Sequence, residues 1–108
     1  MSEFAGTLKE RITIERQVGE RTPAGVQQAA WEPVCSCLAA VALEGAGVES
    51  EAQSLSAMPR YRVTIRARDG IAIDQRVSWR GRLLMVRQRL DDPLAKDRIV
   101  LRCEDVRQ

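Results

Sequence analysis

The sequence predicts an all-β fold, a small six-stranded antiparallel β-barrel or sandwich with a long loop or short helix inserted between the second and third main strands. Residues 60–68 alternate between Tyr61, Val63 and Ile65 on one face and arginines on the other, which is typical of a half-buried strand. Other short strand-like runs follow at near-regular spacing with turn signals between them, as in barrels and sandwiches. Aromatic residues make up only 4% of the chain, so we expect an aliphatic core.

The chain length of 108 residues suits one domain, which we place at residues 8–106, after a flexible N-terminal arm at residues 1–7. The first strand is predicted at residues 8–17, where alternate positions are apolar. Residues 18–29 contain two glycines and a proline, which predict a turn-rich excursion whose end returns as a strand.

The apolar run at residues 31–44 is predicted to be a strand, because Trp31 and Pro33 open it and Gly45 closes it. A buried helix is the alternative, since the run is rich in alanine and leucine. The insertion at residues 44–58 changes character, with glycines first and then a segment that suits a short helix before Pro59. A loop of this length in a compact domain is usually functional or disordered.

Four further strands are predicted after the insertion. Residues 60–90 are predicted to form an antiparallel meander of three strands, with Asp69-Gly70 as the first turn. Residues 91–97 form a polar turn around Pro93, and the last strand is predicted at residues 98–106.

Charge is segregated along the chain, although its formal net charge is only +2. Residues 60–89 carry nine arginines against two aspartates, a net of +7, which leaves eight basic and thirteen acidic residues elsewhere, a net of −5. Such segregation favours self-association or docking as much as contact with DNA. The arginine row therefore has three interpretations, a solvated sheet face, a subunit interface or contact with nucleic-acid phosphates.

No enzymatic site is expected. The chain has no histidine, the commonest general base and metal ligand. Cys35 and Cys37 lie too close together for the usual zinc pair, and Cys103 stands alone. We interpret all three thiols as small hydrophobic side chains in a reduced setting, and we expect no metal and no cofactor. No apolar run approaches the roughly 20 residues that span a bilayer.

A set of short segments, taken in order, matches the pattern of one family. The segments are Leu8-x-x-Arg11-Ile12-Thr13-Ile14, Gly25 followed by Trp31, Val34, Ala40-Val41-x-Leu43, Tyr61-Arg62-Val63-Thr64-Ile65-Arg66, Arg76-Val77, Arg80-Gly81-Arg82 and Leu101-x-Cys103-Glu104. Together they resemble the phage head–tail joining proteins, the stopper or head-closure proteins of long-tailed phages, prophages and gene transfer agents. The resemblance covers nearly the whole chain and rests on order and spacing.

The resemblance implies a non-enzymatic structural subunit of the virion neck, made in the bacterial host cytoplasm. It implies a homo-oligomeric ring, six- or twelve-fold, that joins head to tail and closes the DNA exit channel. The implied partners are a portal-adaptor protein above, a tail terminator or tail-tube protein below, and double-stranded DNA bound without sequence specificity. No membrane partner is implied. In this family the insertion points toward the channel, and its residues here include Glu44, Gly45, Gly47, Val48, Glu49, Glu51 and Leu55.

The charge and the glycines of this insertion suggest how it could close the channel. Its three acidic residues, repeated around a ring, would make a negative constriction that repels DNA phosphates, while its glycines permit large backbone changes. The basic counterpart is a candidate subunit or partner interface made of the arginines Arg60, Arg62, Arg66, Arg68, Arg80 and Arg82.

The alternative function is a nucleic-acid-binding β-barrel of the oligonucleotide-binding type that uses the arginine row. Such proteins stack bases on exposed aromatic side chains. The alternation places Tyr61 on the face opposite the arginines, which favours the structural function.

Overall fold

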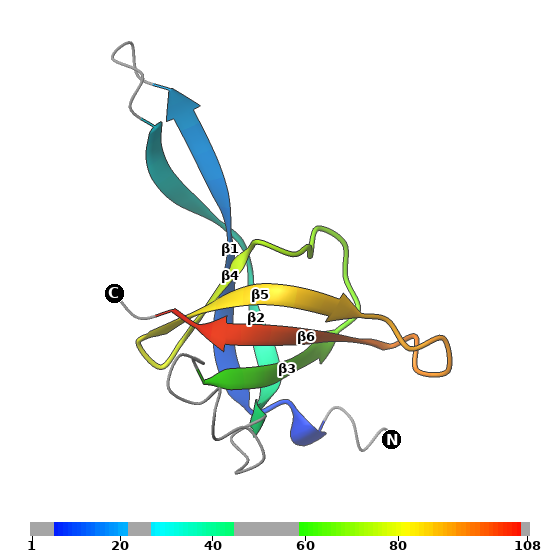
Figure 1. The fold of residues 1–108 in the computed structure, drawn as a ribbon. Helices are drawn as coiled ribbons and strands as arrows, with labels where there is room; N and C mark the ends of the chain where they lie inside the picture. The colour runs from blue at the N-terminus through cyan, green and yellow to red at the C-terminus, as the bar shows by residue number, and fades with distance from the viewer. Residues whose placement is uncertain (1–5, 22–26, 45–58, 107–108) are drawn as a thin grey trace, which may run out of the picture.

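The computed structural model describes residues 6–21, 27–44 and 59–106, and the short helix expected within the insertion lies outside them. The strands are β1 (Glu10–Arg21), β2 (Gln27–Glu44), β3 (Arg60–Arg66), β4 (Arg76–Trp79), β5 (Arg82–Leu90) and β6 (Arg98–Asp105). They close an antiparallel barrel in the order β1-β2-β3-β6-β5-β4, which confirms the all-β class and selects the barrel over the sandwich (Figure 1). No helix in the described residues is long and apolar enough to cross a membrane.

The barrel interior is aliphatic, as the composition predicts. Its fully buried side chains come from every strand and include Ile14, Val63, Leu84 and Leu101, each 0% exposed. Tyr61 and Trp79 pack edge to face at one side of this core, with ring centroids 5.4 Å apart. The prediction that Tyr61 shares the apolar face is thus confirmed.

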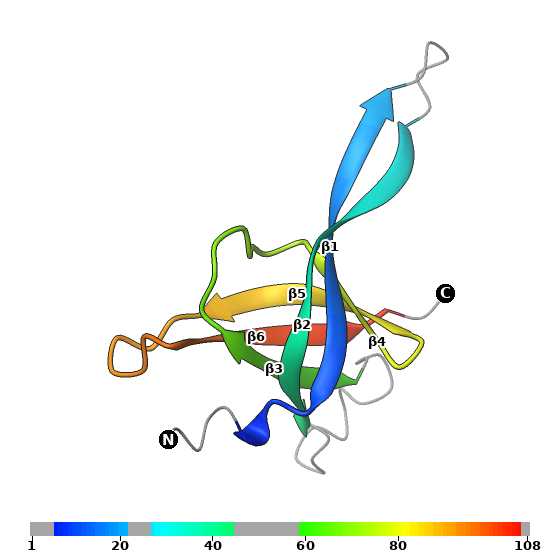
Figure 2. The ribbon, with the colours of Figure 1, turned by 180° about the vertical axis from the view of Figure 1, so that it is seen from behind.

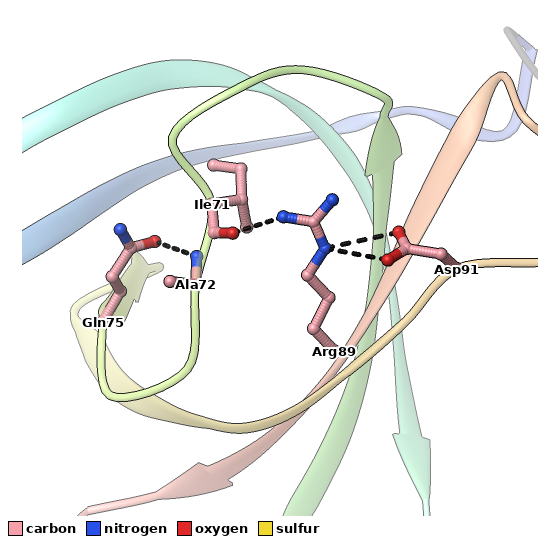
Figure 3. A network of polar contacts seen from close by, with 5 residues as sticks. All are labelled: Ile71, Ala72, Gln75, Arg89 and Asp91. Carbon is pink, nitrogen blue, oxygen red and sulfur yellow. Dashed lines mark hydrogen bonds and ion pairs between the residues drawn. The ribbon is translucent and has the colours of Figure 1, made fainter.

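The prediction of a meander over residues 60–90 was wrong. β3 pairs with β2 and β6, whereas β4 pairs with β1 and β5. The loop between β3 and β4 instead crosses one end of the barrel and is tied down by side chains (Figure 3). The Gln75 side-chain oxygen accepts a hydrogen bond from the Ala72 amide at 3.0 Å, and Arg89 donates to the Ile71 carbonyl. Alternation of apolar and polar residues indicates where a strand lies, but it does not indicate which strands pair with it.

β1 and β2 continue past the barrel as a two-stranded ribbon (Figures 1 and 2). β1 pairs with β4 only over Thr13–Glu15, but its pairing with β2 runs out to Arg21 opposite Gln27. The sequence prediction of a turn-rich excursion over residues 18–29 was therefore wrong for residues 18–21, whereas the prediction that its end returns as a strand is confirmed. A bulge between Ile14 and Glu15 separates the ribbon from the barrel, and bulges bend a strand.

The β4–β5 connection is a tight turn at Arg80 and Gly81. Both residues have positive φ, 49° and 77° respectively, as a two-residue type I′ hairpin requires. Glycine at the second position avoids the steric penalty that a Cβ meets in this conformation.

Gly81→Ala is expected to lower the free energy of unfolding by roughly 1–2 kcal/mol, the cost of left-handed backbone for a residue with a Cβ. A Cβ at Gly81 would meet nothing within 4 Å, so the backbone alone sets this cost. Gly6→Ala is the matched control, because Gly6 has the same free space without a positive φ. Urea unfolding measures both variants, and equal shifts would contradict the assignment of the turn.

Candidate functional site

The outward sides of β3, β5 and β6 carry a group of neighbouring arginines. The register places Arg62 opposite Arg102 and Arg66 opposite Arg98. We call this surface the arginine face and define it by the six side chains Arg60, Arg62, Arg66, Arg87, Arg98 and Arg102. Like charges directly opposite on neighbouring strands repel, so the face needs acidic partners.

Three carboxylates lie among these arginines. Glu44 accepts Arg102 at 3.2 Å and Arg62 at 4.0 Å. Glu104 pairs with Arg87 at 3.1 Å. Asp97 pairs with Arg98 at 3.0 Å, and the hydrogen bond from Arg98 holds the pKa of Asp97 below its usual value. Six arginines against three carboxylates leave a surplus of positive charge on this face.

An open pocket of about 560 Å³ lies within the arginine face. Its lining comprises Glu44, Arg60, Arg87, Gln88, Arg102, Cys103 and Glu104. The pocket coincides with a register shift between Val86 and Gln88, where Arg87 is the extra residue of β5. A bulge leaves an unpaired residue and locally opens the ladder, which explains a hollow at this point of an otherwise closed wall.

Three of the predicted interface arginines lie away from this face. Arg80 pairs with Glu10 at 2.8 Å, and Arg82 pairs with the buried Asp105 at 3.1 Å. A hydrogen bond from the Trp79 indole lowers the pKa of Glu10, with Arg80 adding to the effect. Both ion pairs join β4–β5 to other strands of the same barrel, so these arginines have local structural partners.

Arg68 interacts with two thiols of β2, Cys35 and Cys37. A hydrogen bond to Cys35 raises the pKa of Arg68. Burial raises the pKa of Cys37, and burial alone raises the pKa of Cys103 to about 12. Such a pKa keeps Cys103 as a neutral thiol at physiological pH, which agrees with its interpretation as a small core residue. Among the described residues, no group of three or more metal-ligating side chains gathers.

The root of the insertion belongs to the arginine face. Glu44, the last residue of β2, lies opposite Arg60, the first residue of β3. The chain therefore leaves and re-enters the barrel at one point. The other predicted channel-loop residues, Gly45, Gly47, Val48, Glu49, Glu51 and Leu55, lie outside the described residues.

The turn at residues 91–97, which we call the acidic turn, is a feature that sequence reasoning passed over as a polar connection. Leu94 at its tip is 95% exposed. The Asp92 side chain accepts the Leu94 amide at 2.8 Å, and the Asp92 carbonyl accepts the Ala95 amide at 3.0 Å. In the sequence, only a single leucine between aspartates indicated that this turn has an exposed apolar tip.

The arginine face has no aromatic side chain among the described residues. Tyr61 and Trp79 pack against the core, and Trp31 lies under Arg76, whose guanidinium carbon is 4.3 Å from the ring centroid. A surface that binds single strands by stacking needs exposed rings. The described geometry therefore does not favour the oligonucleotide-binding alternative.

Comparisons with known proteins identify related chains. Residues 5–106 match the family model described as phage head completion protein. The solution structure of a protein from Shigella flexneri 2a is similar, with a TM-score of 0.70 and 28% identity over 93% of this chain and 94% of that chain. A chain in the virion of a native gene transfer agent particle shares the fold, with a TM-score of 0.65 and 17% identity over 92% of this chain and 96% of that chain. A comparison with curated proteins found no match.

Proposed function

Because this chain belongs to the phage head completion protein family, we propose that it is a subunit of the virion neck whose copies form a ring that joins head to tail and closes the DNA exit channel. The family match over residues 5–106 carries the proposal. The family is one of structural proteins, and the chain is not an enzyme.

A virion location has support from a second source. The chain that shares this fold at a TM-score of 0.65 comes from the virion of a gene transfer agent particle. A neck subunit would contact a portal-adaptor protein above, a tail terminator or tail-tube protein below, and the DNA that passes through its ring.

Closure of the channel is assigned to the insertion at residues 44–58. Its acidic residues Glu44, Glu49 and Glu51 have no basic residue among them. Repeated around a ring, they concentrate negative charge where DNA phosphates would pass, and a narrow low-dielectric channel focuses that field. The pairing of Glu44 with Arg62 and Arg102 anchors the start of the insertion to the barrel wall.

Contact between subunits is assigned to the arginine face. Of the arginines proposed from sequence, Arg60, Arg62 and Arg66 lie there, and Arg87, Arg98 and Arg102 join them from β5 and β6. The surplus positive charge of this face matches the acidic excess of the rest of the chain. Ion pairs between this face and another subunit would determine partner choice and association rate more than affinity.

Electron microscopy and native mass spectrometry test the proposal, using the purified full chain alone and added to DNA-filled heads that lack it. We expect closed rings on the portal end of the heads. Chains that bind the heads as single copies, or that bind elsewhere on the particle, would contradict it.

A further inference from the structure

We propose that the acidic turn of one copy docks into the arginine-lined pocket of the next copy, so that subunits join head to tail. The inference rests on the ring proposed above and names the two surfaces that meet within it. The occupant of the pocket is thus a second copy of this chain.

The acidic turn has the form of a projecting contact. Leu94 exposes 95% of its surface to solvent. Burying this side chain against a partner would gain the free energy that the isolated chain forgoes. The turn is fixed by the Asp92 hydrogen bonds and by the Arg98 amide, which donates to the Ala95 carbonyl at 3.3 Å. Residues 91–97 carry three aspartates and one lysine. Asp91 and Asp97 pair with Arg89 and Arg98 of the same chain, which leaves Asp92 as the carboxylate of the turn without an ion pair among the described residues. An apolar tip with an acidic rim needs an apolar floor with a basic rim.

The pocket offers that complement. Arg60, Arg87 and Arg102 supply its basic rim against Glu44 and Glu104. The methylene stems of arginine side chains provide apolar surface while the guanidinium groups stay at the edge. Arg60 is exposed, and no carboxylate of the described residues pairs with it. An aspartate arriving from another copy would therefore find an unused cation.

The two surfaces lie at different ends of one hairpin. The acidic turn projects from the β5–β6 connection, shown in orange in Figure 1. The pocket is lined by Arg102, Cys103 and Glu104 near the far end of β6. A contact between two different patches is heterologous, and repeated heterologous contacts generate rings when the rotation closes. The geometry of a single subunit thus provides both halves of a ring contact.

A second copy fits this pocket better than DNA does. Glu44 and Glu104 line the pocket and would repel phosphates and aspartates alike, so the choice between the two occupants rests on the apolar tip. The acidic turn carries an apolar tip, which a phosphate backbone lacks. Both surfaces are present on every copy, so no further partner is needed.

Two variants separate the halves of the contact. Leu94→Lys places a cation at the tip, where it meets the arginines of the pocket. Arg60→Glu places an anion in the pocket, where it meets the aspartates of the turn. Arg11→Glu is the control, because Arg11 is exposed on β1, outside both surfaces, and undergoes the same charge change. Circular dichroism and thermal unfolding check that each variant is folded before assembly is measured.

Native mass spectrometry and electron microscopy on DNA-filled heads then read out assembly. We expect Leu94→Lys and Arg60→Glu each to weaken subunit association by at least about tenfold, the scale of a buried interface contact, while Arg11→Glu assembles normally. An equimolar mixture of the two variants should assemble better than either variant alone, because the intact turn of one meets the intact pocket of the other and the introduced lysine faces the introduced glutamate.

Each remaining result has a definite meaning. Rings of Leu94→Lys and Arg60→Glu that match wild type overturn this contact but leave the ring function intact. Normal Arg60→Glu rings that lose affinity for double-stranded DNA assign the pocket to DNA and also overturn the contact. Wild-type chains that never form rings on heads overturn the proposed function itself and the contact with it.

Discussion

Deleting residues 48–56 is expected to leave the barrel folded and the ring assembled, but to let packaged DNA escape from filled heads. The deletion removes Glu49 and Glu51, two of the three acidic residues of the proposed constriction. Glu44 stays in place, so its ion pairs with Arg62 and Arg102 are kept. DNA protected from nuclease, counted per head, measures the effect, and we expect the largest loss of any variant considered.

A charge-only variant separates the two ways in which the insertion can act. Glu49→Gln with Glu51→Gln keeps the length of the segment and removes its charge. If repulsion of phosphates holds the DNA, this variant leaks nearly as much as the deletion; if bulk alone blocks the channel, it retains DNA. Heads that stay sealed with the deletion would show that another element closes the channel.

Leu101→Ala is expected to lower the free energy of unfolding by about 2–5 kcal/mol, the range for truncating a large aliphatic side chain in a core. Leu101 is 0% exposed and points into the barrel from β6, opposite Val63 of β3. Its removal leaves a cavity that the closed barrel wall restrains from collapsing. Urea unfolding followed by circular dichroism measures the change.

Leu94→Ala provides the matched comparison, since it makes the same chemical change at the tip of the acidic turn. Leu94 is 95% exposed, so its truncation should leave the stability of the isolated chain within about 0.5 kcal/mol. The same variant should weaken ring assembly. A large loss of stability in Leu94→Ala, or none in Leu101→Ala, would contradict the assignment of core and surface.

Strand positions were predictable from this sequence because burial alternates with period two. Val63 and Ile65 turn inward and Arg62 and Arg66 turn outward, as the pattern indicates. The aliphatic core and the inward position of Tyr61 followed from the same pattern. These features depend on local side-chain chemistry, which a sequence displays directly.

The membership of the arginine face was only partly predictable, because a bulge changes the parity of β5. Strict alternation places Arg87 and Arg89 on the same side. The register shift after Val86 instead brings Gln88 opposite the outward Arg102 and Arg89 opposite the buried Leu101. Arg89 therefore reaches the Ile71 carbonyl and Asp91 at the barrel end (Figure 3), while Arg87 stays on the face.

Strand neighbours and the projecting ribbon were not predictable, because they depend on contacts between distant segments. The barrel closes through three β1–β4 pairs, Thr13 to Glu15 with Ser78 to Arg76. The hydrophobic periodicity of β1 and of β4 does not indicate that these two strands pair. The glycines and proline of residues 18–29 hid the continuation of the first strand as far as Arg21.

Cryo-electron microscopy of the neck of DNA-filled heads shows whether this chain forms the ring and where residues 44–58 lie. We expect a ring of this chain beneath the portal, with residues 44–58 turned toward the channel axis and the acidic turn of each copy seated in the pocket of its neighbour. A neck without this chain, or a ring in which residues 44–58 face outward, would contradict this expectation.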